Sequence, residues 1–124
     1  MKTMGKSFGP IIPVLKGEST DLEAATVAAR EMHDAVVKAA EMFPAGTARG
    51  EVDGSRAKPE IWSQTEEFSS ASQTLIEATA GLVSAGETGD IEAFRAAFQP
   101  MGPACGGCHL GKSAEGGKFR FPKE

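Results

Sequence analysis

The chain has 124 residues, with 13 Lys and Arg against 17 Asp and Glu and a formal net charge of −4. This length fits one domain spanning residues 1–124, and the negative charge argues against nucleic acid or an anionic membrane surface as a partner. No apolar run is long enough to cross a bilayer. Tyrosine is absent, β-branched residues are sparse and alanine is frequent, so the composition favours helices over strands.

Apolar residues recur at helical spacing over residues 1–16, which predicts a first helix. Gly17 follows as a stop signal, because glycine adopts the left-handed conformation that ends helices at little cost. Pro10 and Pro13 lie inside this segment, and we expect a kink or a frayed last turn there.

Thr20 and Glu23 form the pattern of a capping box, with Thr20 at the N-cap. The apolar stripe that follows predicts a second helix over residues 22–43, ended by Pro44. Residues 45–58 contain three glycines and scattered charges without periodicity, and we interpret them as a long solvated loop.

Pro59 suits a first helical position, and the apolar pattern after it predicts a third helix that stops near residues 85–86. The link over residues 86–89 is short, which indicates that the next helix packs antiparallel to the third.

Asp90 is a capping residue for a fourth helix that runs to His109. Pro100 and Pro103 interrupt it, but the apolar period continues across them, so we expect a bend. The tail over residues 110–124 is rich in glycine and charge and is expected to be irregular. Four amphipathic helices predict an all-α, antiparallel four-helix bundle.

The fourth predicted helix ends in the sequence Cys105-Gly106-Gly107-Cys108-His109. In a helix, the two cysteines are three residues apart and His109 is four residues after Cys105, so all three side chains share one face. C-x-x-C-H is typical of covalent attachment of a c-type haem, in which both thiols form thioethers and the imidazole reaches the iron.

Other uses of two cysteines fit less well. A thioredoxin-like C-x-x-C follows a strand in a βαβ context, and a structural zinc site needs four ligands. The chain contains two cysteines and two histidines, and His33 is far from the motif in sequence. A haem-free dithiol protein that uses Cys105 and Cys108 for redox exchange remains a distant alternative.

The chain resembles the class II cytochromes c, the cytochrome c′ family. The motif lies on the last helix, whereas class I cytochromes c have it near the N-terminus. Three further segments are similar to the family in order and spacing: Leu15-Lys16-Gly17-Glu18, Lys58-Pro59-Glu60-Ile61-Trp62 and Ala96-Ala97-Phe98-Gln99-Pro100-Met101-Gly102. The resemblance covers residues 1–109.

This resemblance implies one haem c bound covalently through Cys105 and Cys108 on the last helix of the bundle. It implies a periplasmic, exported bacterial protein that carries electrons to redox partner proteins and is not an enzyme. The first residues, Met1-Lys2-Thr3-Met4-Gly5, do not resemble a signal peptide. Many relatives pair through their first two helices, so a homodimer is a further expectation.

The family resemblance makes His109 the proximal iron ligand and places the opposite axial position on Met1. A methionine there is typical of the low-spin, electron-transferring members. Met1 is either this ligand or an uninvolved terminal residue, and Met4, one turn on, is the substitute ligand or a core residue. An apolar residue that does not bind iron would instead leave a five-coordinate, high-spin haem that binds small gases such as NO and CO.

The aromatic residues Phe8, Trp62, Phe68 and Phe98 are candidates to line the haem pocket, although aromatic residues on helix stripes also form ordinary bundle cores. Six cations, if they surround the haem edge, would suit docking of redox partners: Lys2, Lys6, Lys16, Lys112, Lys118 and Arg120.

Two features depart from the family pattern. The first helix starts about three turns later than is usual in the family. Family members also place Phe-Arg or Tyr-Arg a few residues after the haem histidine, whereas nine residues separate His109 from Phe119-Arg120 here.

Overall fold

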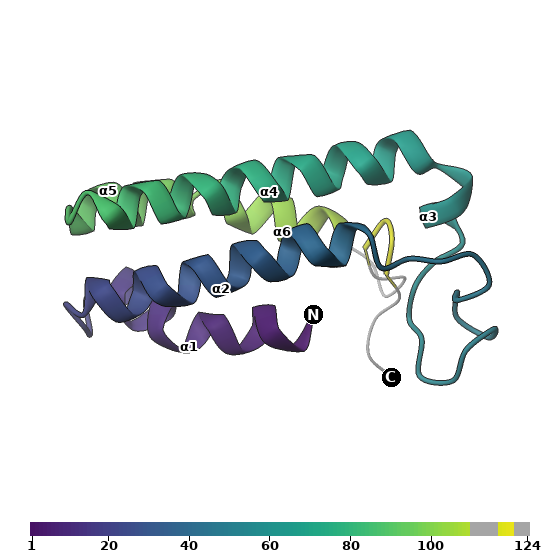
Figure 1. Ribbon diagram of the computed structural model, residues 1–124, viewed down its shortest axis with the longest axis horizontal. Coiled ribbons are helices and arrows are strands. Elements are labelled where there is room, and N and C mark those ends of the chain that lie inside the picture. Colours follow the sequence, from purple (N-terminus) through teal and green to yellow (C-terminus); the bar gives the residue numbers. More distant parts are fainter. Residues whose placement is uncertain (110–116, 121–124) are drawn as a thin grey trace.

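The computed structural model describes residues 1–109 and 117–120, and the regular elements of this part are all helices. They are α1 (Lys2–Lys16), α2 (Leu22–Ala40), α3 (Glu60–Ser63), α4 (Thr65–Glu87), α5 (Ile91–Phe98) and α6 (Met101–His109). α1, α2, α4 and the consecutive pair α5–α6 lie side by side along the long axis (Figure 1). The predicted all-α four-helix bundle is confirmed. Residues 110–116 and 121–124 of the predicted irregular tail lie outside the described residues.

α1 continues through both of its prolines and ends where the sequence indicated. Gly17 has φ 76°, and its N–H donates to the carbonyl oxygens of Pro13 and Val14 near the end of the helix. Both contacts satisfy carbonyl groups that have no partner inside the helix.

The second helix begins at Leu22 as predicted, but its predicted N-cap residue and its predicted C-terminal end are wrong. Asp21, rather than Thr20, is the N-cap, because its Oδ1 accepts a hydrogen bond of 3.0 Å from the backbone N–H of Ala24. The helix stops at Ala40, before Phe43. The carbonyl oxygen of Phe43 accepts a 3.0 Å hydrogen bond from Nε1 of Trp62, so this residue belongs to the loop and its contacts rather than to the helix.

The third and fourth predicted helices are each divided in two. Gln64, with φ −120° and ψ 55°, separates α3 from α4, and Glu66 and Glu67 then favour a new start because carboxylates stabilise a helix N-terminus. A turn at Gln99 and Pro100 separates α5 from α6, where we expected a single bent helix. Pro103 is tolerated because first-turn N–H groups have no partner within the helix.

Each long helix buries the side chains of one of its faces in a common core. Its largest fully buried side chains are Phe94, Ile11, Met32, Leu82, Met101, Val14 and Thr79. Met32 and Met101 are 2% and 1% exposed, so both side chains pack in the core.

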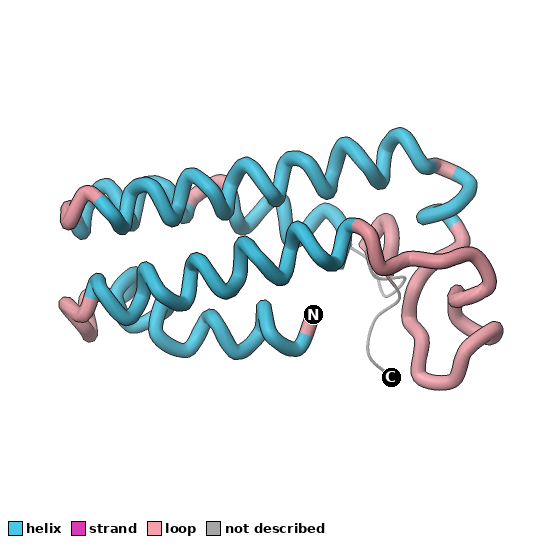
Figure 2. Tube along the Cα trace, in the orientation of Figure 1, coloured by secondary structure: helices cyan, strands magenta, loops and turns pink. Residues whose placement is uncertain are grey.

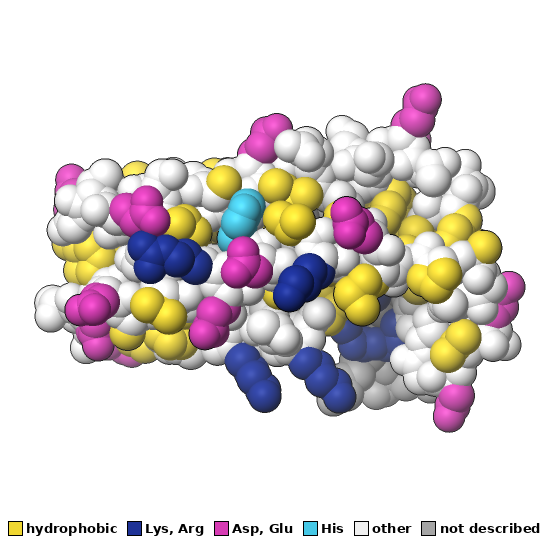
Figure 3. All heavy atoms as spheres, viewed as in Figure 1, with side chains coloured by type: hydrophobic (Ala, Val, Ile, Leu, Met, Phe, Trp, Pro, Cys, Tyr) yellow, Lys and Arg dark blue, Asp and Glu magenta, His cyan; other side chains and the backbone are white. Residues whose placement is uncertain are grey.

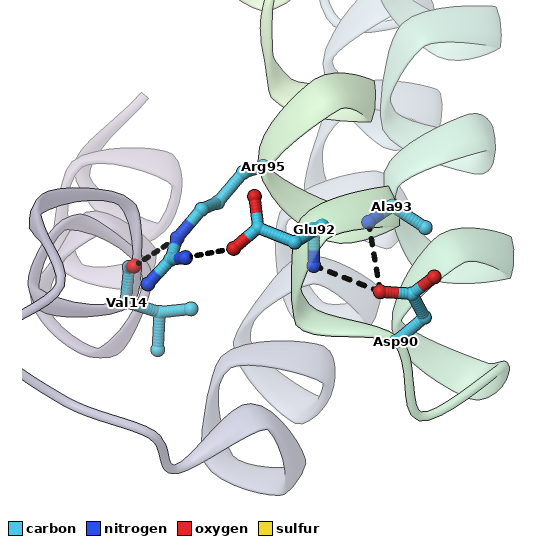
Figure 4. A network of polar contacts seen from close by, with 5 residues as sticks. All are labelled: Val14, Asp90, Glu92, Ala93 and Arg95. Carbon is cyan, nitrogen blue, oxygen red and sulfur yellow. Dashed lines mark hydrogen bonds and ion pairs between the residues drawn. The ribbon is translucent and has the colours of Figure 1, made fainter.

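Arg95 fixes the C-terminal end of α1 against α5 (Figure 4). Its Nε donates a 3.0 Å hydrogen bond to the carbonyl oxygen of Val14, and its Nη1 pairs with Glu92. Asp90 caps the N-terminus of α5, because its side chain accepts hydrogen bonds from the N–H groups of Glu92 and Ala93, as the sequence predicted. This network holds α1 at the end of the bundle opposite to its own N-terminus.

The other end of the bundle, where α1 begins, gathers three separate parts of the chain. The start of α1, the end of α6 and the long loop between α2 and α3 all lie there (Figures 1 and 2). Among the described residues, no helix is long and apolar enough to span a membrane.

Candidate functional site

The structure places Cys105, Cys108 and His109 on α6, which ends at His109. Both cysteines are free thiols with intermediate exposure. A Cβ atom built on Gly106 or Gly107 would meet nothing within 4 Å, so the space that a side chain would fill is open at both glycines. A bulky group has room to approach this part of the helix.

Burial raises the pKa of the Cys105 thiol above its usual value. The pKa of Cys108 is also raised, first by burial and then by the neighbouring Cys105. Both sulfurs are therefore neutral thiols at pH 7, which disfavours spontaneous thiolate chemistry.

His109 is held as a neutral imidazole with one nitrogen engaged. Burial is the main cause that lowers its pKa, followed by the positive charges of Arg56 and of the amino group of Met1. Nη1 of Arg120 lies 2.9 Å from Nδ1 of His109. Because a guanidinium can only donate, Nδ1 accepts in this contact and the proton of the neutral ring is on Nε2. Nε2 can bind a metal only when that proton is on Nδ1 instead, and Arg120 then gives up this hydrogen bond.

The segment 117–120 folds back onto the end of α6. The N–H of Lys118 donates to the carbonyl oxygen of Gly107 at 3.2 Å, and that of Phe119 donates to Cys108 at 3.4 Å. These bonds satisfy carbonyl groups at the helix C-terminus. They also bring Arg120 close to His109. The nine residues between His109 and Phe119, which depart from the family spacing, therefore do not keep the side chains of Arg120 and His109 apart.

Phe119 anchors this segment. It is 4% exposed, and its ring packs edge-on against Phe68 with centroids 5.2 Å apart. Phe68 makes a second edge-on contact with Phe43 at 5.0 Å. Trp62, which donates to the carbonyl oxygen of Phe43, is joined to this cluster.

The other candidate pocket residues form a second group. Phe8 of α1 and Phe98 of α5 are in edge-on contact at 6.2 Å, and both are partly buried against the core. Met4 and Cys105 pack against the same core. Met1 is the N-cap of α1 and is 53% exposed, at the end of the bundle where α6 also ends (Figure 1).

The donor set fits a covalently attached haem. Two neutral thiols supply the sulfur atoms for thioether bonds, and the imidazole of His109 would supply an axial ligand through Nε2 in the tautomer that carries its proton on Nδ1. Groups of three or more His, Cys, Asp or Glu side chains that would hold a bare metal ion are absent from the described residues.

A four-helix bundle whose last helix ends in C-x-x-C-H defines the class of bundle-type c cytochromes. The family model described as "Cytochrome C'" matches residues 1–111. The chain therefore belongs to the cytochrome c′ family, whose members carry a covalent haem c and are electron carriers or haem proteins rather than enzymes.

Individual relatives agree with this assignment. The chain is 34% identical over 111 residues to cytochrome c-554 of Cereibacter sphaeroides, covering 88% of this chain and 72% of the relative. It is 32% identical over 106 residues to cytochrome c′ of Alcaligenes xylosoxydans xylosoxydans, covering 86% and 80%. A solved nitric oxide complex of a cytochrome c prime mutant from Alcaligenes xylosoxidans superimposes with a TM-score of 0.80 at 28% identity, covering 97% and 86%.

Sequence reasoning missed two residues of this site. Arg56 lies in the loop that we interpreted as solvated, and nothing in its sequence surroundings indicated that its charge reaches His109. Phe119 was counted as part of the irregular tail, although the family's aromatic-Arg pair was a signal for it.

Proposed function

We propose that this chain is a periplasmic, mono-haem cytochrome that transfers single electrons through low-spin haem. Cys105 and Cys108 attach the haem, and His109 and Met1 are its axial ligands. The redox partners are other proteins, the functional unit is the single domain over residues 1–124, and pairing with a second copy of the chain is compatible with this role.

The observation that carries the proposal is the arrangement of α1 and α6. α1 begins and α6 ends at the same end of the bundle, with Met1 at the start of one helix and His109 at the end of the other (Figure 1). A thioether is a soft, neutral ligand that favours ferrous iron and raises the reduction potential. Two protein ligands also leave little to rearrange when the iron changes oxidation state.

The bound haem supplies the one-electron chemistry, and the chain's own residues tune and shield it. Arg120 lies within hydrogen-bond distance of Nδ1 of His109, where its positive charge acts on the axial ligand. Phe8 and Phe98 contact each other edge-on and, like Met4, pack against the apolar core, so they would offer the haem an apolar surface.

Replacement of Met1 by alanine in the exported, haem-loaded protein tests the sixth ligand. The visible spectrum should change from sharp low-spin bands, with a weak far-red iron–methionine band in the oxidised state, to broad high-spin bands. Met42, which is 71% exposed in the loop after α2, is the matched control, and Met42→Ala should leave the spectrum unchanged. An unchanged spectrum in Met1→Ala would eliminate Met1 as a ligand.

The second candidate is a five-coordinate, high-spin cytochrome that binds small gases. The exposure of Met1 at the helix cap favours it, because an exposed terminal side chain is poorly pre-organised as a ligand. The nitric oxide complex of the structural neighbour is in line with this alternative. Broad high-spin bands in the unaltered protein that change on addition of CO would support gas binding over electron transfer.

A further inference from the structure

Hydrogen bonds within the loop between α2 and α3 involve both neighbours of Arg56, Ser55 and Ala57. Oγ of Ser55 donates to the carbonyl oxygen of Thr47 at 2.7 Å and accepts from the N–H of Ala57 at 3.3 Å. The N–H of Arg49 donates to the carbonyl oxygen of Ala57 at 2.9 Å. The backbone that carries Arg56 is therefore fixed by residues on either side of it.

The same backbone is joined to the segment that covers the end of α6. Ala57 forms an antiparallel bridge with Arg120, and the N–H of Lys58 donates to the carbonyl oxygen of Phe119 at 3.0 Å. Arg120 contacts His109 directly. Arg56 is thus one residue away from a continuous hydrogen-bonded connection to the proximal histidine.

Arg56 brings a positive charge to this place. Its side chain is half-buried, and among residues 1–109 and 117–120 no ion pair joins it to a carboxylate. Lys and Arg side chains lie in the recess between the long loop and the bundle (Figure 3). A fixed, partly desolvated cation is costly unless an anion accompanies it.

We propose that Arg56 binds a propionate carboxylate of the covalently attached haem. A guanidinium offers a planar pair of N–H donors that matches a carboxylate in two parallel hydrogen bonds. This contact would neutralise one of the two negative charges that the haem brings into the site. The inference rests on haem attachment at Cys105 and Cys108 and is independent of which group is the sixth ligand.

Resonance Raman spectra of the haem-loaded protein test this proposal, because the propionate bending band reports hydrogen bonding to the carboxylate. Arg56→Gln should shift this band and lower the reduction potential, since a positive charge beside the haem disfavours ferric iron. Arg56→Lys keeps the charge but loses the paired donors. It should retain the potential while the band still shifts.

Arg30→Gln is the matched control. Arg30 pairs with Glu87 at 2.9 Å between α2 and α4, and both side chains are about half exposed, so its loss should leave band and potential unchanged. An unshifted propionate band in both Arg56 variants, with haem content equal to that of the unaltered protein, would overturn this inference alone. Absence of covalent haem from the unaltered protein would overturn the proposed function as well.

Discussion

At the residue scale, the contact between Arg120 and His109 connects the tail to the iron ligand. A positive charge within hydrogen-bond distance of an axial ligand opposes the additional charge of ferric iron. Arg120→Gln is therefore expected to lower the reduction potential by roughly 59 mV, which corresponds to a tenfold change in a one-electron equilibrium. Spectroelectrochemical titration of the haem-loaded protein measures this value.

Arg120→Lys is the control for that measurement, because it keeps the charge and changes the geometry. Its potential should lie closer to that of the unaltered protein than to that of Arg120→Gln. Equal potentials in all three proteins would show that Arg120 serves only to hold the tail.

At the scale of elements, α2 and α4 approach each other closely where Thr26 faces Gly86. A Cβ atom at Gly86 would lie 2.3 Å from Oγ1 of Thr26 and 3.0 Å from its Cβ. Thr26 has little freedom to move aside, because its hydroxyl donates a 2.7 Å hydrogen bond to the carbonyl oxygen of Leu22. Glycine at this position is what allows the two helices to pack at this distance.

Gly86→Ala should therefore destabilise the fold by about 1–2 kcal/mol, because overpacking outweighs the gain of about 1 kcal/mol in helix propensity. Denaturant unfolding measures the change. Gly81 lies in the same helix with open space around it, so Gly81→Ala should stabilise by about 1 kcal/mol. Stabilisation by both substitutions would mean that the helices are not in close contact at Thr26.

At the scale of the whole molecule, one core holds all the long helices together. Buried residues of α1, α2, α4, α5 and α6 form a single cluster, and Cys105 of the haem motif packs against it. The loop and the tail add to this unit through their hydrogen bonds to each other and to α6. A chain of this size with one shared core is expected to unfold in one step.

Equilibrium unfolding followed by far-UV circular dichroism and by haem absorbance should therefore give coincident transitions. Gly86→Ala, far from the motif in sequence, should shift both curves by the same amount. A haem transition that precedes the loss of helix would show that the site opens separately and would contradict the single-unit description.

The bundle was predictable because amphipathic helices carry their spacing in the local sequence. The stripe on α2, the cap at Asp90 and the stop at Gly17 are short-range signals, and the structure contains all three. Helix ends were less predictable, since Asp21 and Thr20 are both good capping residues and only the folded chain selects between them. The breaks at Gln64 and Pro100 were likewise missed, because the apolar period continues through them.

The sequence by itself determined the fold class and the haem motif, because both depend on residues within a few positions of one another. Tertiary structure alone decided what surrounds His109. Phe119 and Arg120 come from a tail without periodic pattern, and they meet the motif through contacts with Cys108 and His109. Arg56 comes from a loop that is equally without pattern, and its neighbour Ala57 is bridged to Arg120. These contacts join residues that are far apart in the sequence, so they depend on the tertiary fold and cannot be predicted from the local spacing of residues.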